Sequence, residues 1–267
     1  MPSLKDLRNR IDSVKSTKKI TQAMKMVAAS KLKKAQSLAE KGRSYSFGLD
    51  SIVKGLVNSS ESIEHPLLEN NVGDKNSSLI IVVSSDRGLC GGLNSNIVKA
   101  VKKKIDELEE KKISASLVCV GKKGYDLLSG LYEKMFNFEV KQINIGEIDY
   151  KSTEEVGKKI LNSFYKNDFQ ECCLFYNYFN SVISQEVKVE KLIPYSKSSR
   201  TDTENQNNID PYFDYEPNEE EVLSKILPKN FIVQIYKAIL ESRASEQGAR
   251  MTAMDNATRN AGEMIDN

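Results

Sequence analysis

The C-terminal stretch ESRASEQGARMTAMDNATRNAGEMI, residues 241–265, decides the fold of this 267-residue chain. It contains no proline, and a row of alanines recurs at every fourth position: Ala249, Ala253, Ala257 and Ala261. Residues four apart lie above one another on one face of a helix. Because small side chains allow a second helix to approach closely, this stretch predicts a long helix packed against another helix.

The same helix is expected to begin well before the alanine row, so that it covers residues 219–267. Ile232, Ile235 and Ile239 give it an apolar seam at helical spacing. Pro228 either kinks this helix or begins its main run.

The first 58 residues predict the partner helix, since they contain no glycine before Gly42 and no proline after Pro2. A coiled-coil seam with spacings of three and four residues is formed by Leu4, Leu7, Ile11 and Val14. We expect two lysines to interrupt it and a slightly shifted seam to follow, made of Ile20, Met24, Val27 and Ala28. A helix of this length spans roughly 80 Å at about 1.5 Å per residue, so much of it must project from any compact domain. The two ends are predicted to form an antiparallel coiled coil; two separate bundle helices are the alternative.

The middle of the chain alternates strand-like and helix-like runs, which predicts an α/β layer with right-handed crossovers. Strands are expected at 78–84, 115–120, 135–143, 172–178 and 186–193. Helices are expected at 94–110, 124–131 and 153–167. The predicted division is therefore an N-terminal helix (1–58), a linker (59–76), an α/β domain (77–195), a polar loop (196–218) and a C-terminal helix (219–267).

Composition excludes several classes of protein. The formal net charge is +2, from 39 basic and 37 acidic residues, whereas a dedicated nucleic-acid binder is usually strongly basic. No run approaches the roughly 18 apolar residues of a membrane span, and the N-terminus has no apolar signal core. The four cysteines form no CxxC pair, and adjacent Cys172 and Cys173 are expected to be buried on opposite faces of one strand.

The stretch most similar to an enzyme site is SSDRGLCGGLN, residues 84–94, between a buried strand and a helix. Phosphates bind at this place in doubly wound proteins. The stretch matches neither GxGxxG nor GxxxxGK[ST], so we interpret it as a tight glycine-rich turn that packs closely against a neighbour. His65 is the only histidine, which argues against hydrolytic triads. No metal-ligand spacing is present, and we predict no catalytic residue, cofactor or metal.

Basic residues dominate the first 35 positions, where the acids are only Asp6 and Asp12. A projecting basic helix suggests an acidic partner surface, which nucleic acid, anionic lipid or an acidic protein cavity would each provide. A coiled-coil adaptor on nucleic acid or membrane is therefore the alternative function.

Three collinear stretches resemble the gamma subunit of F-type ATP synthases. They are TKKITQAMKMVAASKLKKAQ (17–36), SSDRGLCGGLN (84–94) and residues 241–265. The resemblance implies a coiled coil inside a ring of three alpha and three beta subunits. It also implies a Rossmann-like α/β domain at the foot, bound to epsilon and to the membrane c-ring. The chain would then be a non-catalytic rotor that couples proton-driven rotation to ATP synthesis in beta. It would be peripheral on the cytoplasmic side of a bacterial inner membrane, with the matrix side of the mitochondrial inner membrane as the less favoured alternative.

The resemblance also implies which residues contact beta. On the first helix, Met24 and Lys25 match the position that faces an acidic loop of beta, and Lys18 and Lys19 are added as further contacts. On the last helix the contacts are Arg243, Glu246 and Arg250. Family members usually continue past the point where this chain ends, and no dithiol insertion is expected here.

Overall fold

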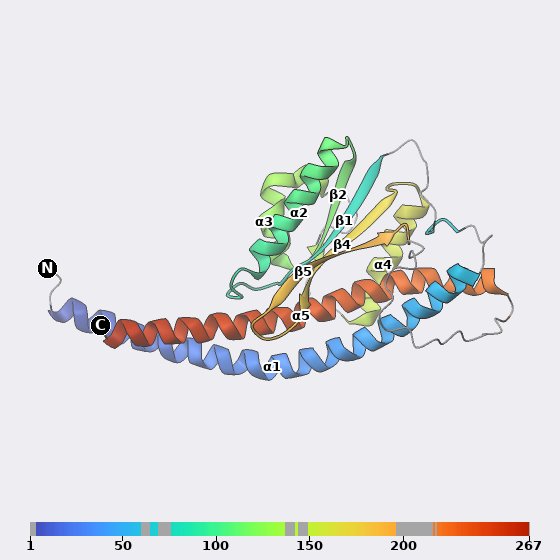
Figure 1. Cartoon of the computed structure of the whole chain (residues 1–267). Coiled ribbons are helices and arrows are strands. Elements are labelled where there is room, and N and C mark those ends of the chain that lie inside the picture. Colours follow the sequence, from blue (N-terminus) through green and yellow to red (C-terminus); the bar gives the residue numbers. More distant parts are fainter. Residues whose placement is uncertain are drawn as a thin grey trace.

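The computed structural model describes residues 4–59, 65–68, 76–136, 142–143, 149–195, 216 and 218–266. Two long helices, α1 (Leu4–Ser59) and α5 (Glu219–Asp266), run antiparallel along one another in a gently curved pair. An α/β domain lies against one part of this pair, and the rest projects beyond it (Figure 1). The predicted fold class, a coiled coil of the two ends with an α/β domain inserted between them, is confirmed. The predicted linker and polar loop fall largely outside the described residues.

A five-stranded sheet forms the centre of the domain, in the order β3-β2-β1-β4-β5. The first four of these strands are parallel, and β5 pairs antiparallel with β4. The strands are β1 (Ser77–Val83), β2 (Ser114–Val120), β3 (Gln142–Ile143), β4 (Glu171–Phe179) and β5 (Gln185–Ile193). The third predicted strand was placed too early, because Glu133–Met135 is a turn of 3₁₀-helix, and residues 137–141 lie outside the described part.

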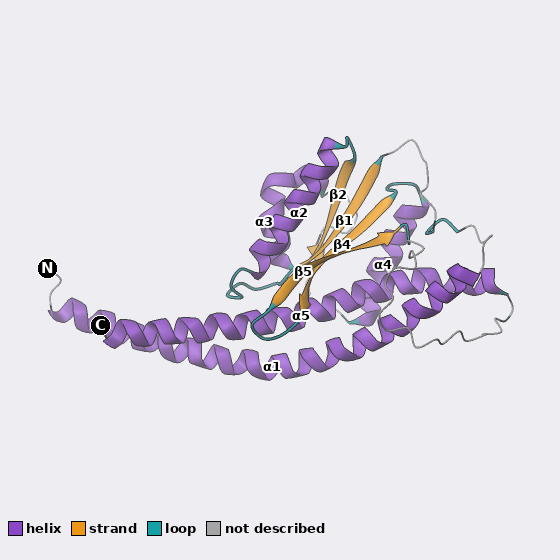
Figure 2. Ribbon diagram, in the orientation of Figure 1, coloured by secondary structure: helices purple, strands orange, loops and turns teal. Residues whose placement is uncertain are grey.

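Helices cover both faces of the sheet (Figure 2). One face packs against α2 (Leu93–Glu110) and α3 (Lys122–Tyr132). The other face packs against α4 (Tyr150–Tyr165) and the coiled coil. Cys172 and Cys173 are both buried, one in each of these two apolar cores, as their adjacency on a strand predicts.

The seam of α1 runs on without the predicted phase shift. Counting on from Val14 in steps of four and three leads to Lys18, Thr21, Lys25 and Ala28. Of the four residues predicted for the shifted seam, Ala28 is buried and Met24 half-buried, whereas Ile20 and Val27 are 59% and 55% exposed and Thr21 is buried instead. The prediction was wrong because it followed apolar side chains, while polar side chains occupy the helix interface here.

The alanine row also has a different neighbour from the predicted one. Ala249 and Ala253 line a hollow shared with Gly91 and Gly92 of the glycine-rich turn. The side of α5 that meets α1 instead carries Leu240, Ala244, Met251, Met254, Thr258 and Ala261. Only the first two members of the row depart from the prediction: Ala249 and Ala253 serve the close approach of the α/β domain, whereas Ala261 is buried on the side that meets α1.

Pro228 lies inside α5, nine residues after its start, so it does not begin the helix. Two parts of the helix pair are distinguished below. The docked part, residues 32–59 of α1 and 219–253 of α5, carries the α/β domain. The projecting part comprises residues 4–31 of α1 and 254–266 of α5 (Figure 1).

Candidate functional site

The projecting part is held together by polar contacts across the helix pair. The hydroxyls of Thr21 and Thr258 are 2.7 Å apart. The Lys25 ammonium donates to Asp255 at 2.6 Å, and both side chains are partly exposed. The Lys18 ammonium lies 3.2 Å from where a Cβ at Gly262 would stand. Exposed polar contacts of this kind contribute little to stability, so this part of the helix pair is held together weakly.

The outer surface of the projecting part combines apolar and basic side chains. Ile20, Met26 and Val27 are all more than half exposed. The basic side chains of residues 4–31 of the same helix are exposed too, with the exception of half-buried Lys25. A rod with this surface is suited to an acidic, partly apolar partner that surrounds it.

The glycine-rich turn is fastened to α5 by Arg250. The Arg250 guanidinium donates to the carbonyl oxygen of Gly88 at 3.2 Å and forms an ion pair with Glu246 at 2.7 Å. Burial raises the pKa of Glu246, while the charge and hydrogen bond of Arg250 act in the opposite direction. The turn therefore packs against a neighbouring helix, as predicted.

Within the turn, polar groups bind one another. Ser85 and Asn94 exchange hydrogen bonds, and the backbone N–H of Lys122 donates to the Asp86 carboxylate at 3.1 Å. Gly121 has a φ of 104°, and a Cβ there would stand 2.1 Å from the carbonyl oxygen of Ser84. This close approach requires glycine. The turn is a packing element, built without the lysine that phosphate-binding loops direct at their ligand.

The predicted partner-contact residues fall into two groups. Lys18, Lys19, Met24 and Lys25 lie on the projecting part of α1, with the first two exposed and the others half-buried. Glu246 and Arg250 lie instead against the α/β domain, where they bind each other and the turn. Half-buried Arg243 adds its positive charge to the surroundings of Glu246. Contact of any of these residues with a beta subunit stays a prediction.

One ion pair with a fully buried carboxylate was not predicted from the sequence. Arg43 of α1 binds Glu241 of α5 through two nitrogens, and the Glu241 side chain is fully buried. A signal was present in the sequence: the small residues Ala244, Ser245 and Gly248 follow the Glu241 carboxylate on its face of the helix, which predicts a closely packed neighbour there. A carboxylate on such a face needs a cation nearby.

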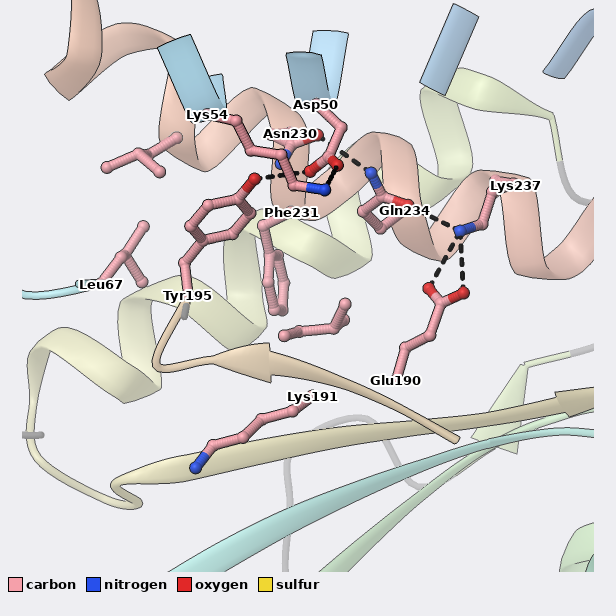
Figure 3. Close-up of a pocket in the computed structure, with 12 residues that line it drawn as sticks. Asp50, Lys54, Leu67, Glu190, Lys191, Tyr195, Asn230, Phe231, Gln234 and Lys237 are labelled. Atoms are coloured by element: carbon pink, nitrogen blue, oxygen red, sulfur yellow. Dashed lines mark hydrogen bonds and ion pairs between the residues drawn. The ribbon is translucent and has the colours of Figure 1, made fainter. Parts of the chain in front are cut away.

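A cavity of about 340 Å³ lies between the helix pair and β5 (Figure 3). Several of its polar side chains form hydrogen bonds or ion pairs with one another. Tyr195 donates to Asp50 at 2.6 Å, Asp50 also pairs with Lys54, and Lys237 pairs with Glu190. Phe231 contributes part of the apolar lining. These bonds join the coiled coil to the end of the sheet.

The histidine and the cysteines are held within the fold by hydrogen bonding or burial. His65 accepts a hydrogen bond from the backbone N–H of Leu67 at 3.1 Å, and burial lowers its pKa. Burial raises the pKa of the Cys119 thiol to about 12 and that of Cys173 to about 11. Within the described ranges, His, Cys, Asp and Glu side chains form no group of three that could bind a metal ion. In the same part of the chain, no helix is long and apolar enough to cross a bilayer.

Comparison with known proteins connects this geometry to one family. A family model described as ATP synthase matches residues 3–267, which include both long helices and the inserted domain. The chain belongs to the ATP synthase gamma chain family. The gamma chain of Pelagibacter ubique is 45% identical over 267 residues, which cover 100% of this chain and 90% of that protein. The gamma chain of Azorhizobium caulinodans is 42% identical over 266 residues, or 99% and 90% of the two chains.

Solved structures agree with the family assignment. The chain is similar to one from the central stalk and c-ring of the Tetrahymena thermophila mitochondrial ATP synthase, with a TM-score of 0.67 and 30% identity. That alignment covers 89% of this chain and 99% of the other. A rotor chain of the Euglena gracilis mitochondrial ATP synthase has a TM-score of 0.63 over 97% and 92% of the two chains. At 15% identity, this second likeness concerns the fold alone.

Proposed function

We propose that this gamma-family chain is the central rotor shaft of an F-type ATP synthase, where it couples ion-driven rotation to ATP synthesis by other subunits. The observation that carries the proposal is the family match over the whole chain, including the projecting coiled coil that a shaft requires. A long curved helix pair with a domain on one side is asymmetric about its own axis. When such a body turns inside a ring, each rotor angle favours a different conformation of each surrounding subunit.

The chain acts in this proposal as a non-catalytic subunit. The glycine-rich turn is occupied by its own hydrogen bonds and by Arg250, and His65 is part of a loop contact. ATP is made in the beta subunits, and the shaft contributes differential binding energy. The competing function, an adaptor on nucleic acid or membrane, has only the basic helix in its favour, and that same feature suits an acidic protein partner.

The proposed partners are three alpha and three beta subunits around the projecting part, with epsilon and the c-ring at the foot. The chain would be peripheral at the cytoplasmic side of a bacterial inner membrane, held there through the c-ring. The mixture of apolar and basic side chains around Ile20 and Val27 supports a protein cavity as the partner of the projecting part.

Contacts with beta are proposed for the residues named from the family resemblance. Met24 and Lys25 lie on the projecting part with partly exposed side chains, which suits this role. Met24→Lys adds a cation next to Lys25, and we expect a new ion pair with an acidic loop of beta to raise friction. ATP-driven rotation in the assembled complex should then slow, with ion pumping per ATP reduced. Unchanged rotation and coupling would remove Met24 from the contact surface.

Reconstitution tests the function itself. The chain is purified with alpha and beta subunits of the same organism, and the stoichiometry is measured by native mass spectrometry. One copy per three alpha–beta pairs, and rotation of a probe fixed to the α/β domain during ATP hydrolysis, are expected. Assembly in any other ratio, or a static probe in an active complex, would contradict a rotor role. Salt-dependent binding to DNA or anionic vesicles would favour the adaptor instead.

A further inference from the structure

The end of β4 is completed by side chains of α5. Pairing between β4 and β1 stops at Phe175, four residues before β4 ends. Beyond this point, the backbone N–H of Asn177 donates to the Ser242 hydroxyl at 3.2 Å, and the Ser245 hydroxyl donates to the Asn177 carbonyl at 3.0 Å. The N–H of Phe179 donates to the Glu241 carboxylate at 3.1 Å. Polar groups of a helix thus satisfy a buried strand edge that would otherwise lack partners.

Arg43 connects this junction to the other long helix. Its guanidinium donates to both carboxylate oxygens of Glu241, at 2.7 Å for the bond from Nη2 to Oε2, and to the carbonyl oxygen of Phe179 at 2.8 Å. It also lies 4.5 Å from the centroid of the Tyr178 ring. One side chain therefore bonds α5 and β4 from α1. The planar guanidinium fixes direction as well as distance, because its donors form a rigid fork.

The surroundings leave the junction little freedom to slide. A Cβ added to Gly42 would stand 2.8 Å from Cδ1 of Leu240, so α1 and α5 approach closely beside the ion pair. A Cβ added to Gly248 would stand 3.0 Å from the Phe179 ring. Most other ion pairs of the helix pair have partly or fully exposed side chains, or join two residues of the same helix. Lys25–Asp255 joins α1 to α5 through partly exposed side chains. Lys225–Glu221 is exposed and lies within α5.

We propose that the junction of Arg43, Glu241 and the end of β4 is the element that transmits torque between the α/β domain and the shaft, with Arg43 as the positioning residue. The inference rests on the proposed rotor function. Besides the chain connections at its two ends, the domain passes a turning force to the helix pair through the contacts between them. The ties around the cavity, Tyr195–Asp50 and Lys237–Glu190, each join the sheet end to one helix, whereas Arg43 joins both helices to β4 at one point.

A first experiment measures whether Arg43 holds the junction closed. Hydrogen exchange of the Asn177 and Phe179 amides is compared in the wild-type chain, in Arg43→Met and in Glu241→Gln. Arg43→Met leaves the buried Glu241 carboxylate without its cation, which is strongly destabilising, and exchange of the two amides should rise about 100- to 1,000-fold. The matched control is Lys225→Met, which removes an exposed cation from α5 and should leave both amides unchanged. Unchanged exchange in Arg43→Met would overturn the proposal.

A second experiment tests torque separately from folding. Replacing both charges, in Arg43→Met/Glu241→Met, removes the pair without leaving a buried charge, so the chain should remain folded. In the complete membrane-bound complex, we expect ATP hydrolysis to continue and ATP-driven ion pumping per ATP hydrolysed to be lost in proportion to the exchange rate of Phe179. Arg43→Lys keeps the charge but not the fork, and its pumping should fall between wild type and the double variant.

The outcomes separate the two proposals. Full pumping per ATP in the double variant, with a fast-exchanging Phe179 amide, would overturn the torque role of the junction and leave the rotor function intact. A wild-type complex that assembles and hydrolyses ATP but turns no shaft would instead overturn the rotor function.

Discussion

The docked and projecting parts of the helix pair share one uninterrupted seam but fill it with different chemistry. In the docked part, the seam of α1 carries Leu49, Val53 and Leu56, all buried against the α/β domain or α5. In the projecting part, the middle of the seam carries Lys18, Thr21 and Lys25, between half-buried Val14 and buried Ala28. The difference shows that the docked part supplies the hydrophobic stability, while the projecting part keeps apolar side chains such as Ile20 and Val27 on its outside.

The two parts therefore divide stability from recognition. Burial of apolar surface holds the docked part to the sheet, and contacts in the projecting part are polar and partly exposed, which makes each worth little. A surface that does not need its apolar side chains for folding can present them to a partner. Substitutions at matched positions of the two parts test this division.

The largest effect is expected from matched leucines on the seam of α1. Leu56 is fully buried, so Leu56→Ala should lower the free energy of unfolding by about 2–5 kcal/mol, through lost transfer energy and a cavity. Leu7 is 43% exposed, so Leu7→Ala should change the free energy of unfolding by less than about 0.5 kcal/mol. Urea denaturation of the full chain measures both. Equal losses at the two sites would mean that the projecting part contributes to folding as much as the docked part does.

Matched glycines of α5 should respond with opposite signs. Alanine is better than glycine inside a helix by about 1 kcal/mol. A Cβ at Gly262 would meet only the flexible end of Lys18, so Gly262→Ala should raise stability by up to about 1 kcal/mol. A Cβ at Gly248 would stand 3.0 Å from the buried Phe179 ring, and the overpacking cost of about 1–3 kcal/mol should make Gly248→Ala destabilising. Thermal unfolding of both variants is the measurement, and a stabilised Gly248→Ala would show that the domain can shift along the coil.

The smallest effect concerns two carboxylates whose pKa values move in opposite directions. The hydrogen bond and charge of Lys25 lower the pKa of Asp255, whereas burial raises that of Glu246. Asp255 therefore contributes stability above its unfolded pKa and loses that contribution as the pH falls through its folded value. Glu246 does the reverse, and favours folding less as the pH rises from its unfolded to its folded pKa.

Carboxyl titration by NMR measures both shifts. Lys25→Met should return the pKa of Asp255 to its ordinary range, while Lys33→Met, which removes an exposed lysine from the same helix, should leave it unchanged. If the pKa of Asp255 stays low in Lys25→Met, the ion pair across the projecting part does not form in solution.

Prediction from sequence succeeded where a regular pattern leads directly to structure. The buried run SLIIVVS became β1 with six consecutive buried residues, and the spacing of Ile97, Val101 and Ile105 became the buried face of α2. Prediction failed where it had to identify which surface of the chain a side chain packs against. Ile20 was placed on the seam because it is apolar, and Ala249 was placed against α1 because it is small, yet both choices depend on which surface each helix finds.

The site followed the same rule. Lys18, Lys19, Met24 and Lys25 could be placed on the projecting helix from the sequence, since a continuous helix keeps them together. The ion pair of Arg43 and Glu241 could not be predicted, because the two residues are 198 positions apart and the sequence around each one does not identify its partner. Arg250 was predicted to contact a beta subunit, and in the structure its guanidinium donates a hydrogen bond within the chain, to the carbonyl oxygen of Gly88.

Two long helices, an inserted α/β domain and a basic projecting end follow from the sequence, because helical and strand periodicity and charge distribution are properties of the chain alone. Packing in three dimensions was needed to show that the seam continues through polar residues, and that α5 completes the edge of β4. It also decided that Arg43 binds both helices to the sheet. These features depend on desolvation and hydrogen-bond geometry between distant segments, which exist only once the segments have packed.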